Sequence, residues 1–273
     1  MKRVKMLAVL NAIFFVVAFA ISMLSQVGFF KYNMSEVSAK YDTVFTPAGI
    51  TFSVWGIIYT ALFIFCIYHL IKAFRENESH EANQSLIKVG WLFIINNIAI
   101  SAWVVFWLNE QLIASVILML IQLLSLIFIH VRLNILDIGK SIQGKLCTQF
   151  PLSIYFAWIC IASIANISAT LVGYNWNGGL ISPSYWTIIM IGIATLLSIF
   201  VILVKQNVFF GLVVIWALYG IVLKRTDVDP ATYGNVINAA RTGIAVVFLA
   251  ELIQSIKLLR LTKPSSEISA RHG

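Results

Sequence analysis

The sequence is poor in charge, in proline and in cysteine. Only 11% of its 273 residues are Asp, Glu, Lys or Arg, whereas a soluble domain usually carries about 25%. The three cysteines (Cys66, Cys147 and Cys160) are too few and too scattered for a disulfide framework or a CxxC metal site. No histidine pairs convincingly with a second ligand on one helix face, so we expect no metal site.

What the sequence has instead is long apolar runs. Hydrophobic residues make up 60% of the chain, and the mean hydropathy is +0.91. Stretches of near-zero charge recur at lengths suited to helices crossing a bilayer core of about 30 Å. The predicted fold class is all-α, a polytopic transmembrane helical bundle of about eight spans, at residues 6–28, 50–71, 89–108, 111–133, 149–172, 185–204, 208–223 and 235–258. The span at 208–223 is short for a bilayer.

The basic residues predict how the chain is oriented. With the N-terminus inside, 14 of the 19 lysine and arginine residues fall on the cytoplasmic side and four on the outer side. This bias follows the positive-inside rule and places both termini in the cytoplasm. Because the bias is clean and no organelle transit peptide is visible, we predict a multi-pass protein of the plasma membrane. The scattered basic residues give no support for nucleic-acid binding.

The N-terminus also fits a secretory signal peptide. It has a basic start, an apolar run and an A-x-A-like site at Ala18-Phe19-Ala20. The apolar run continues toward Phe30, however, which is long enough to span a membrane. We therefore favour an uncleaved first helix.

Few segments between the spans are long. Residues 31–48 form an outer segment of mixed polarity, and residues 72–88 form a polar cytoplasmic linker whose charges we expect to be solvated. The break at 205–207 is short and predicts a tight hairpin. We expect residues 262–273 to be a disordered cytoplasmic tail.

The stretch TVFTPAGITFSVWGIIY, residues 43–59, opens the second span. Thr46 can cap a helix and Pro47 suits its first turn. Phe52, Trp55 and Tyr59 then share one helix face. An aromatic belt at the membrane boundary explains Trp55 well, but it explains the deeper Tyr59 less well, because a buried hydroxyl needs a partner.

This stretch resembles a family signature. Without a gap, it resembles the P-x-W-V-x-x-P-V-W-x-x-L-Y segment of the TspO/MBR family, the tryptophan-rich sensory proteins and the translocator protein (peripheral benzodiazepine receptor), through Pro47, Ile50, Val54, Trp55, Ile58 and Tyr59. Tyr155-Phe156-Ala157-Trp158 followed by Asn166 is similar to the family's Y-L-A-W segment, and Asn97 stands where the family has the Asn of L-N-x-x-W. The departures are Gly49, Ser53, Ile100 and Ile154, which stand where the family has Trp, Pro, Trp and Pro.

The resemblance covers about residues 1–177. It implies a TspO-like five-helix transmembrane core over 1–177, with three additional helices over 178–261 outside it. It also implies an aromatic-lined cavity under the loop between the first two spans, and it often implies a homodimer. The expected ligand is hydrophobic or amphiphilic, with porphyrin, haem and sterols as the family examples; a bound porphyrin or haem is a candidate ligand, and no cofactor is required.

Eight residues are the candidate ligand contacts. They are Phe52, Trp55, Tyr59, Asn97, Trp103, Tyr155, Trp158 and Asn166. For several the alternative is structural: Trp55 and Tyr59 as belt or packing, Asn97 and Asn166 as amides that join helices. Ala165 and Ala169 form a small-xxx-small pair suited to close packing or to a dimer face.

Two further functions remain open at this level. Arg241 and Glu251 are ionisable residues inside a span, which are functional candidates by default. They favour a small transporter or permease as the alternative to a sensory, ligand-binding protein. A structural partner in the membrane is the third alternative. No nucleophile triad, carboxylate pair or phosphate loop is visible, so we do not expect an enzyme.

Overall fold

The structure is a computed structural model that describes residues 1–134, 139–176 and 178–261, so the predicted tail at 262–273 lies outside it. Every regular element in the described ranges is helical, which confirms the all-α class. Seven helices are long and apolar enough to cross a bilayer, and the bent pair formed by α4 (Glu81–Val89) and α5 (Leu92–Leu108) brings the number to eight.

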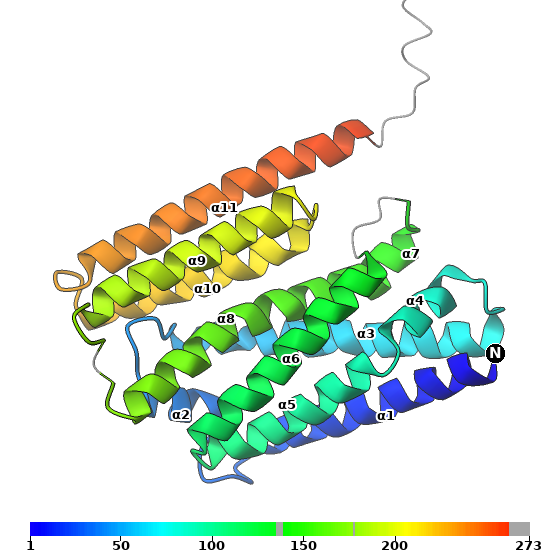
Figure 1. Cartoon of the computed structure of the whole chain (residues 1–273), viewed down its shortest axis with the longest axis horizontal. Helices are drawn as coiled ribbons and strands as arrows, with labels where there is room; N and C mark the ends of the chain where they lie inside the picture. Colours follow the sequence, from blue (N-terminus) through cyan, green and yellow to red (C-terminus); the bar gives the residue numbers. More distant parts are fainter. Residues whose placement is uncertain (135–138, 177, 262–273) are drawn as a thin grey trace, which may run out of the picture.

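Five long helices form a closed ring. Around the ring each helix packs on the next, in the order α1 (Lys2–Leu24), α3 (Val54–Arg75), α8 (Phe150–Gly173), α6 (Leu112–Leu133) and α5, which returns to α1. The short helix α2 (Met34–Lys40) lies at one end of this bundle, and the N-terminus, α4 and α7 (Ile142–Gly144) lie at the other (Figure 1). We call the first of these the α2 end.

The remaining helices pack on one another beside the ring (Figure 1). They are α9 (Pro183–Leu203), α10 (Val208–Val228) and α11 (Gly234–Leu261), and α10 provides most of their contact with α8. α10 continues five residues past the predicted end at 223, so the prediction of a short span was wrong. Its last turns carry Lys224 and Arg225, and both side chains form ion pairs with Asp42 of the 31–48 segment. These contacts stabilise the last turns as helix.

The polar linker 72–88 is more ordered than the sequence predicts. Part of it is α4, whose Asn83 is fully buried and donates through its side-chain amide to the carbonyl oxygen of Asn77 at 2.7 Å. Gly90 ends α4 with φ +54°, a conformation that glycine adopts without strain, and the chain bends by 54° into α5. The charged residues of the linker are exposed or partly exposed, as predicted, but its uncharged residues include a buried helix face that the sequence analysis did not predict.

Thr46 does not cap the second span as predicted. Its hydroxyl oxygen instead accepts from the backbone N–H of Thr43 at 3.0 Å and lies 3.0 Å from the Thr43 hydroxyl. The helix begins later, with a 3-10 turn, η1 (Gly49–Ser53), that leads into α3. Residues 41–48 thus form a tight, partly buried strap across the α2 end.

α8 is the central helix of the molecule, with the ring on one side and α10 on the other. Every side chain from Pro151 to Ile161 is buried. Ala165 and Ala169 face the interior too: Ala165 lines a cavity and Ala169 is only 3% exposed. Of the two alternatives for this pair, close packing agrees with these positions better than a dimer face does.

Candidate functional site

Aromatic rings from α3 and α8 meet inside the ring of helices, near the α2 end. Trp55 stacks on Tyr59 with ring centroids 5.4 Å apart, and meets Trp158 edge-on at 6.1 Å. Phe52, from η1, also meets Trp158 edge-on, at 6.0 Å. These are the preferred geometries of aromatic pairs. Residues that the sequence could place only on separate helices thus form one cluster.

An inner cavity of about 50 Å³ lies against this cluster. Five of the eight predicted contacts line it: Phe52, Trp55, Trp103, Trp158 and Asn166. α8 adds Ala162 and Ala165, which are small and leave the space open, and Pro47 and Ser38 close it from the segment before α3. Ligand pockets for small molecules usually measure about 300–1,000 Å³, so this cavity is too small for such a ligand in the present conformation.

A larger groove of about 1010 Å³ lies between α1 and α3. Phe15, Phe19 and Ser22 of α1 line one side, and Trp55, Tyr59 and Phe63 of α3 line the other. The Tyr59 hydroxyl and the Ser22 hydroxyl oxygen are 2.5 Å apart, which provides the partner that this buried phenol needs. The groove is large enough for a multi-ring amphiphile.

Phe52 and Trp55 belong to both spaces. Each lines the inner cavity and also the groove. We call these two side chains the aromatic partition. Any ligand that occupies both spaces has to pass it.

Polar groups are few at the cavity, and most already have partners. The indole N–H of Trp103 donates to the Asn166 side-chain oxygen at 3.1 Å, and the Asn166 amide donates to the Ser115 hydroxyl oxygen at 3.0 Å. Asn166 therefore joins α5, α6 and α8 while it faces the cavity. The indole nitrogen of Trp158 is buried and has no hydrogen-bond partner among the described residues. It is a donor that a ligand could use.

The other two predicted contacts lie outside both spaces. The Tyr155 hydroxyl donates to the Asn96 side-chain oxygen at 2.7 Å, and the Asn96 amide donates to the Ser125 hydroxyl oxygen at 2.7 Å. Asn97 donates to the carbonyl oxygen of Phe93 within its own helix at 2.7 Å. These bonds give both residues a structural role, although the Tyr155 ring lies 6.2 Å from that of Trp55.

The segment over the α2 end is fixed to the α5–α6 turn. Trp107 donates from its indole N–H to the Met34 carbonyl oxygen at 3.4 Å. The Lys40 ammonium lies 2.5 Å from a carboxylate oxygen of Glu110, and the Tyr41 hydroxyl donates to the same carboxylate at 2.5 Å. The bond from Lys40, and then the bond from Tyr41, lowers the pKa of the Glu110 carboxyl below its ordinary value of 4.5.

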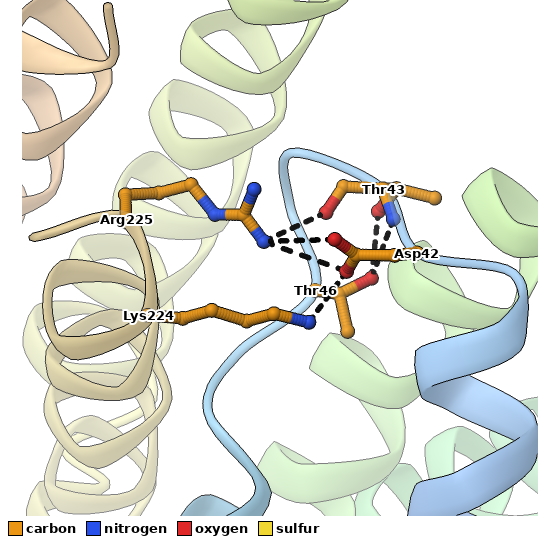
Figure 2. A network of polar contacts seen from close by, with 5 residues as sticks. All are labelled: Asp42, Thr43, Thr46, Lys224 and Arg225. Atoms are coloured by element: carbon orange, nitrogen blue, oxygen red, sulfur yellow. Dashed lines mark hydrogen bonds and ion pairs between the residues drawn. The ribbon is translucent and has the colours of Figure 1, made fainter. Parts of the chain in front are cut away.

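The other side of the same segment is fixed to α10 (Figure 2). Arg225 and Lys224 both contact the carboxylate of Asp42, and the Arg225 guanidinium also donates to the Thr43 carbonyl oxygen at 3.4 Å. Figure 2 shows these side chains reaching from α10 to the strap around Thr43 and Thr46. Arg225 is only 2% exposed, so its guanidinium is largely desolvated, whereas the Asp42 side chain is 39% exposed. Sequence reasoning missed it because it treated Lys224 and Arg225 only as outer-loop charges.

Arg241 and Glu251 do not lie together. Arg241 is exposed, and no ion pair joins it to Asp227 or Asp229, all three being within the described part of the chain. Glu251 is 8% exposed and its carboxyl lies where a side chain at Gly211 would stand. Glu251 therefore points into α10, while Arg241 lies on the exposed side of α11.

The ring of helices, its small aromatic cavity and its apolar surface define the class: a multi-span helical membrane protein with a buried aromatic cluster. A comparison with protein-family models agrees and is more specific. The model described as TSPO-like protein matches residues 8–253, and the chain therefore belongs to the TSPO-like protein family. The comparisons with curated proteins and with solved structures each found no match.

The family match extends well beyond residue 177, where the resemblance described from the sequence ends. It covers α9 and α10 and most of α11. The motifs come from helices that surround the aromatic cavity, so they carry no information about the helices outside the ring.

Proposed function

We propose that this protein binds a hydrophobic or amphiphilic ligand, a tetrapyrrole such as porphyrin or haem or a sterol-like molecule, against the aromatic partition. The observation that supports this most is the double role of Phe52 and Trp55, which face both the inner cavity and the α1–α3 groove. Aromatic faces and apolar walls suit flat, apolar rings, and burying apolar surface supplies the binding free energy. The role would be sensory or ligand-holding, in keeping with the resemblance.

The ligand would first occupy the groove, whose volume already suits it, and would then displace the partition toward the inner cavity. There the unpartnered indole N–H of Trp158 would donate to a polar atom of the ligand. With the predicted orientation, the α2 end faces outward, and the site lies in the outer half of the plasma membrane. A homodimer remains a prediction without an assigned surface.

The test is a thermal-shift panel on detergent-purified protein with haem, protoporphyrin IX, sterols and amphiphilic drugs. A ligand that binds only the folded state stabilises it by about 2.7 kcal/mol at a hundredfold excess over its dissociation constant. We expect a tetrapyrrole to give the largest shift, and the shift to fall in the Trp55→Ala/Trp158→Ala double variant. Trp91→Ala is the matched control, because Trp91 is half exposed and lines neither the cavity nor the groove. A double variant that stays folded and binds with unchanged affinity would remove the site assignment.

A transporter is the second candidate, and one observation favours it. Among the buried side chains of α9, of α11 and of the turn between α9 and α10, four have an atom without a hydrogen-bond partner among the described residues: Ser198, Asn207, Glu251 and Gln254. Such groups inside a membrane are costly unless they serve a function. Flux into liposomes that Glu251→Gln abolishes, while Asp227→Asn preserves it, would support this candidate. Absence of flux over a broad substrate panel would leave the binding function alone.

A further inference from the structure

One of the two side chains of the aromatic partition lies on an element with weak internal hydrogen bonding. Trp55 belongs to the long helix α3, but Phe52 belongs to η1, a 3-10 turn of five residues. Such turns have poorer hydrogen-bond geometry than an α-helix and depend more on their surroundings. What holds η1 in place therefore decides where the Phe52 ring stands.

α10 holds η1 on both sides. The indole N–H of Trp216 donates to the carbonyl oxygen of Thr51 at 3.0 Å. Four residues further along α10, the carbonyl oxygen of Gly220 accepts from the backbone N–H of Ala48 at 3.0 Å. Ala48 comes just before η1, and Thr51 comes directly before Phe52. Both hydrogen bonds with α10 therefore act close to Phe52.

Gly220 also sets how closely α10 and η1 approach. A Cβ atom at position 220 would lie 2.0 Å from the Thr51 hydroxyl oxygen and 3.0 Å from the Cβ of Pro47. Thr51 is 1% exposed and Pro47 is buried, so neither can turn freely away. Pro47 itself lines the inner cavity. Any side chain at position 220 would therefore displace the wall of the cavity.

We propose that Trp216 and Gly220 of α10 are positioning residues for the ligand site: they set the place of Phe52 and Pro47, and so make α9–α11 part of the control of ligand binding. The inference rests on the proposed function for the identity of the ligand. It gives the three helices outside the ring a role that the aromatic motifs do not reveal. Because coupling between two sites is reciprocal, a ligand at the partition would in turn change how firmly α10 packs on η1.

The binding experiment uses the full chain and protoporphyrin IX as the probe, followed by quenching of tryptophan fluorescence. Gly220→Ala displaces η1, and we expect the dissociation constant to change by at least about fivefold, the lower end of usual coupling strengths. The matched control is Gly192→Ala on α9, where an added Cβ meets nothing within 4 Å.

Trp216→Phe keeps an aromatic ring at position 216 but removes the N–H that donates to Thr51. This variant tests the proposal if Gly220→Ala does not fold. Its control is Trp186→Phe on α9, which removes an indole bond to the Gly178 carbonyl oxygen in the loop before that helix.

A second readout needs no ligand. Ser38 lines the inner cavity, so the rate at which Ser38→Cys reacts with a small thiol reagent, in a Cys147→Ser background, reports how open the cavity is. We expect Gly220→Ala and Trp216→Phe to raise this rate, and Gly192→Ala and Trp186→Phe to leave it unchanged.

The outcomes separate the two proposals. If protoporphyrin IX and the other probes do not bind the unaltered protein, the proposed function fails, while a changed Ser38→Cys rate still supports positioning by α10. If the probe binds but Gly220→Ala and Trp216→Phe match their controls in affinity and in labelling rate, the positioning role is overturned.

Discussion

The guanidinium of Arg225 lies 3.3 Å from the carboxylate of Asp42, although 183 residues separate the two in the chain. The pair joins α10 to the strap over the α2 end, and its cationic side is buried while Asp42 is partly exposed. A cation so desolvated is costly to leave without its partner.

Asp42→Asn should therefore destabilise the protein. The amide keeps the shape of the carboxylate but removes its charge, so the buried guanidinium loses its compensation. We expect a loss of about 1–3 kcal/mol, the range for a buried polar group left unsatisfied, measured as a lower midpoint of thermal unfolding in detergent. Lys224→Ala removes a more exposed contact to the same carboxylate and should cost less, about 0–1 kcal/mol. Equal losses of stability from Asp42→Asn and Lys224→Ala would contradict the larger contribution that we assign to Arg225.

Asn96 and Asn97 form a matched pair of neighbouring buried amides. Asn96 binds Ser125 and accepts from Tyr155, so it joins α5 to α6 and α8. Asn97 binds within its own helix. Asn96→Ala leaves the Tyr155 hydroxyl without an acceptor and should cost about 1–3 kcal/mol, whereas Asn97→Ala should cost clearly less. Thermal unfolding of both variants checks this, and the reverse order would show that Asn97 has a role beyond the observed bond.

Tyr59→Phe removes the hydroxyl that meets Ser22 and leaves the ring stacked on Trp55. Hydrogen bonds between membrane helices contribute about 0.6 kcal/mol on average and up to about 1.7, so the expected loss lies in that range. A double-mutant cycle with Ser22→Ala measures it, because the two single losses should not add. Full additivity would mean that the two hydroxyls do not interact.

Acid should loosen the contact between the strap and the α5–α6 turn. The pKa of Glu110 is lowered in the folded protein, first by Lys40 and then by Tyr41, so its contribution to stability is fully present above the ordinary value of 4.5. It is lost as the pH falls through the lower, folded-state pKa. The unfolding midpoint of the unaltered protein should thus show an acid-dependent decrease that Glu110→Gln lacks. Parallel pH profiles for the two proteins would rule out this carboxylate as the titrating group.

The long apolar helices were predictable because hydropathy is a local property. The spans at 111–133 and 185–204 match α6 and α9 within two residues at either end. The end of α10 was not predictable in this way, because Lys224 and Arg225 look like loop residues until Asp42 is brought beside them. α4 was missed for a related reason: Asn83 looks solvated in the sequence, but in the fold it satisfies carbonyl groups at a helix end.

The residues of the candidate site also divide into those that the local sequence indicates and those that it does not. Phe52, Trp55, Trp158 and Asn166 could be proposed from motifs on two spans, and the structure gathers them around one cavity. Ser38 and Met119 also line it, but nothing in their local sequence marks them. Phe15 and Phe19 of α1, spaced one helical turn apart and both lining the groove, carried a usable signal that was not used.

The sequence by itself determined the membrane-spanning, all-helical class and the helices that carry the aromatic residues, because a bilayer imposes length and apolarity on each span separately. Only the tertiary structure decided that the cavity is small, that Phe52 and Trp55 divide it from a groove, and that α10 holds the turn carrying Phe52. These features depend on contacts between segments far apart in the chain, up to the 165 positions between Thr51 and Trp216, and no local pattern in a chain specifies which of its distant segments will meet.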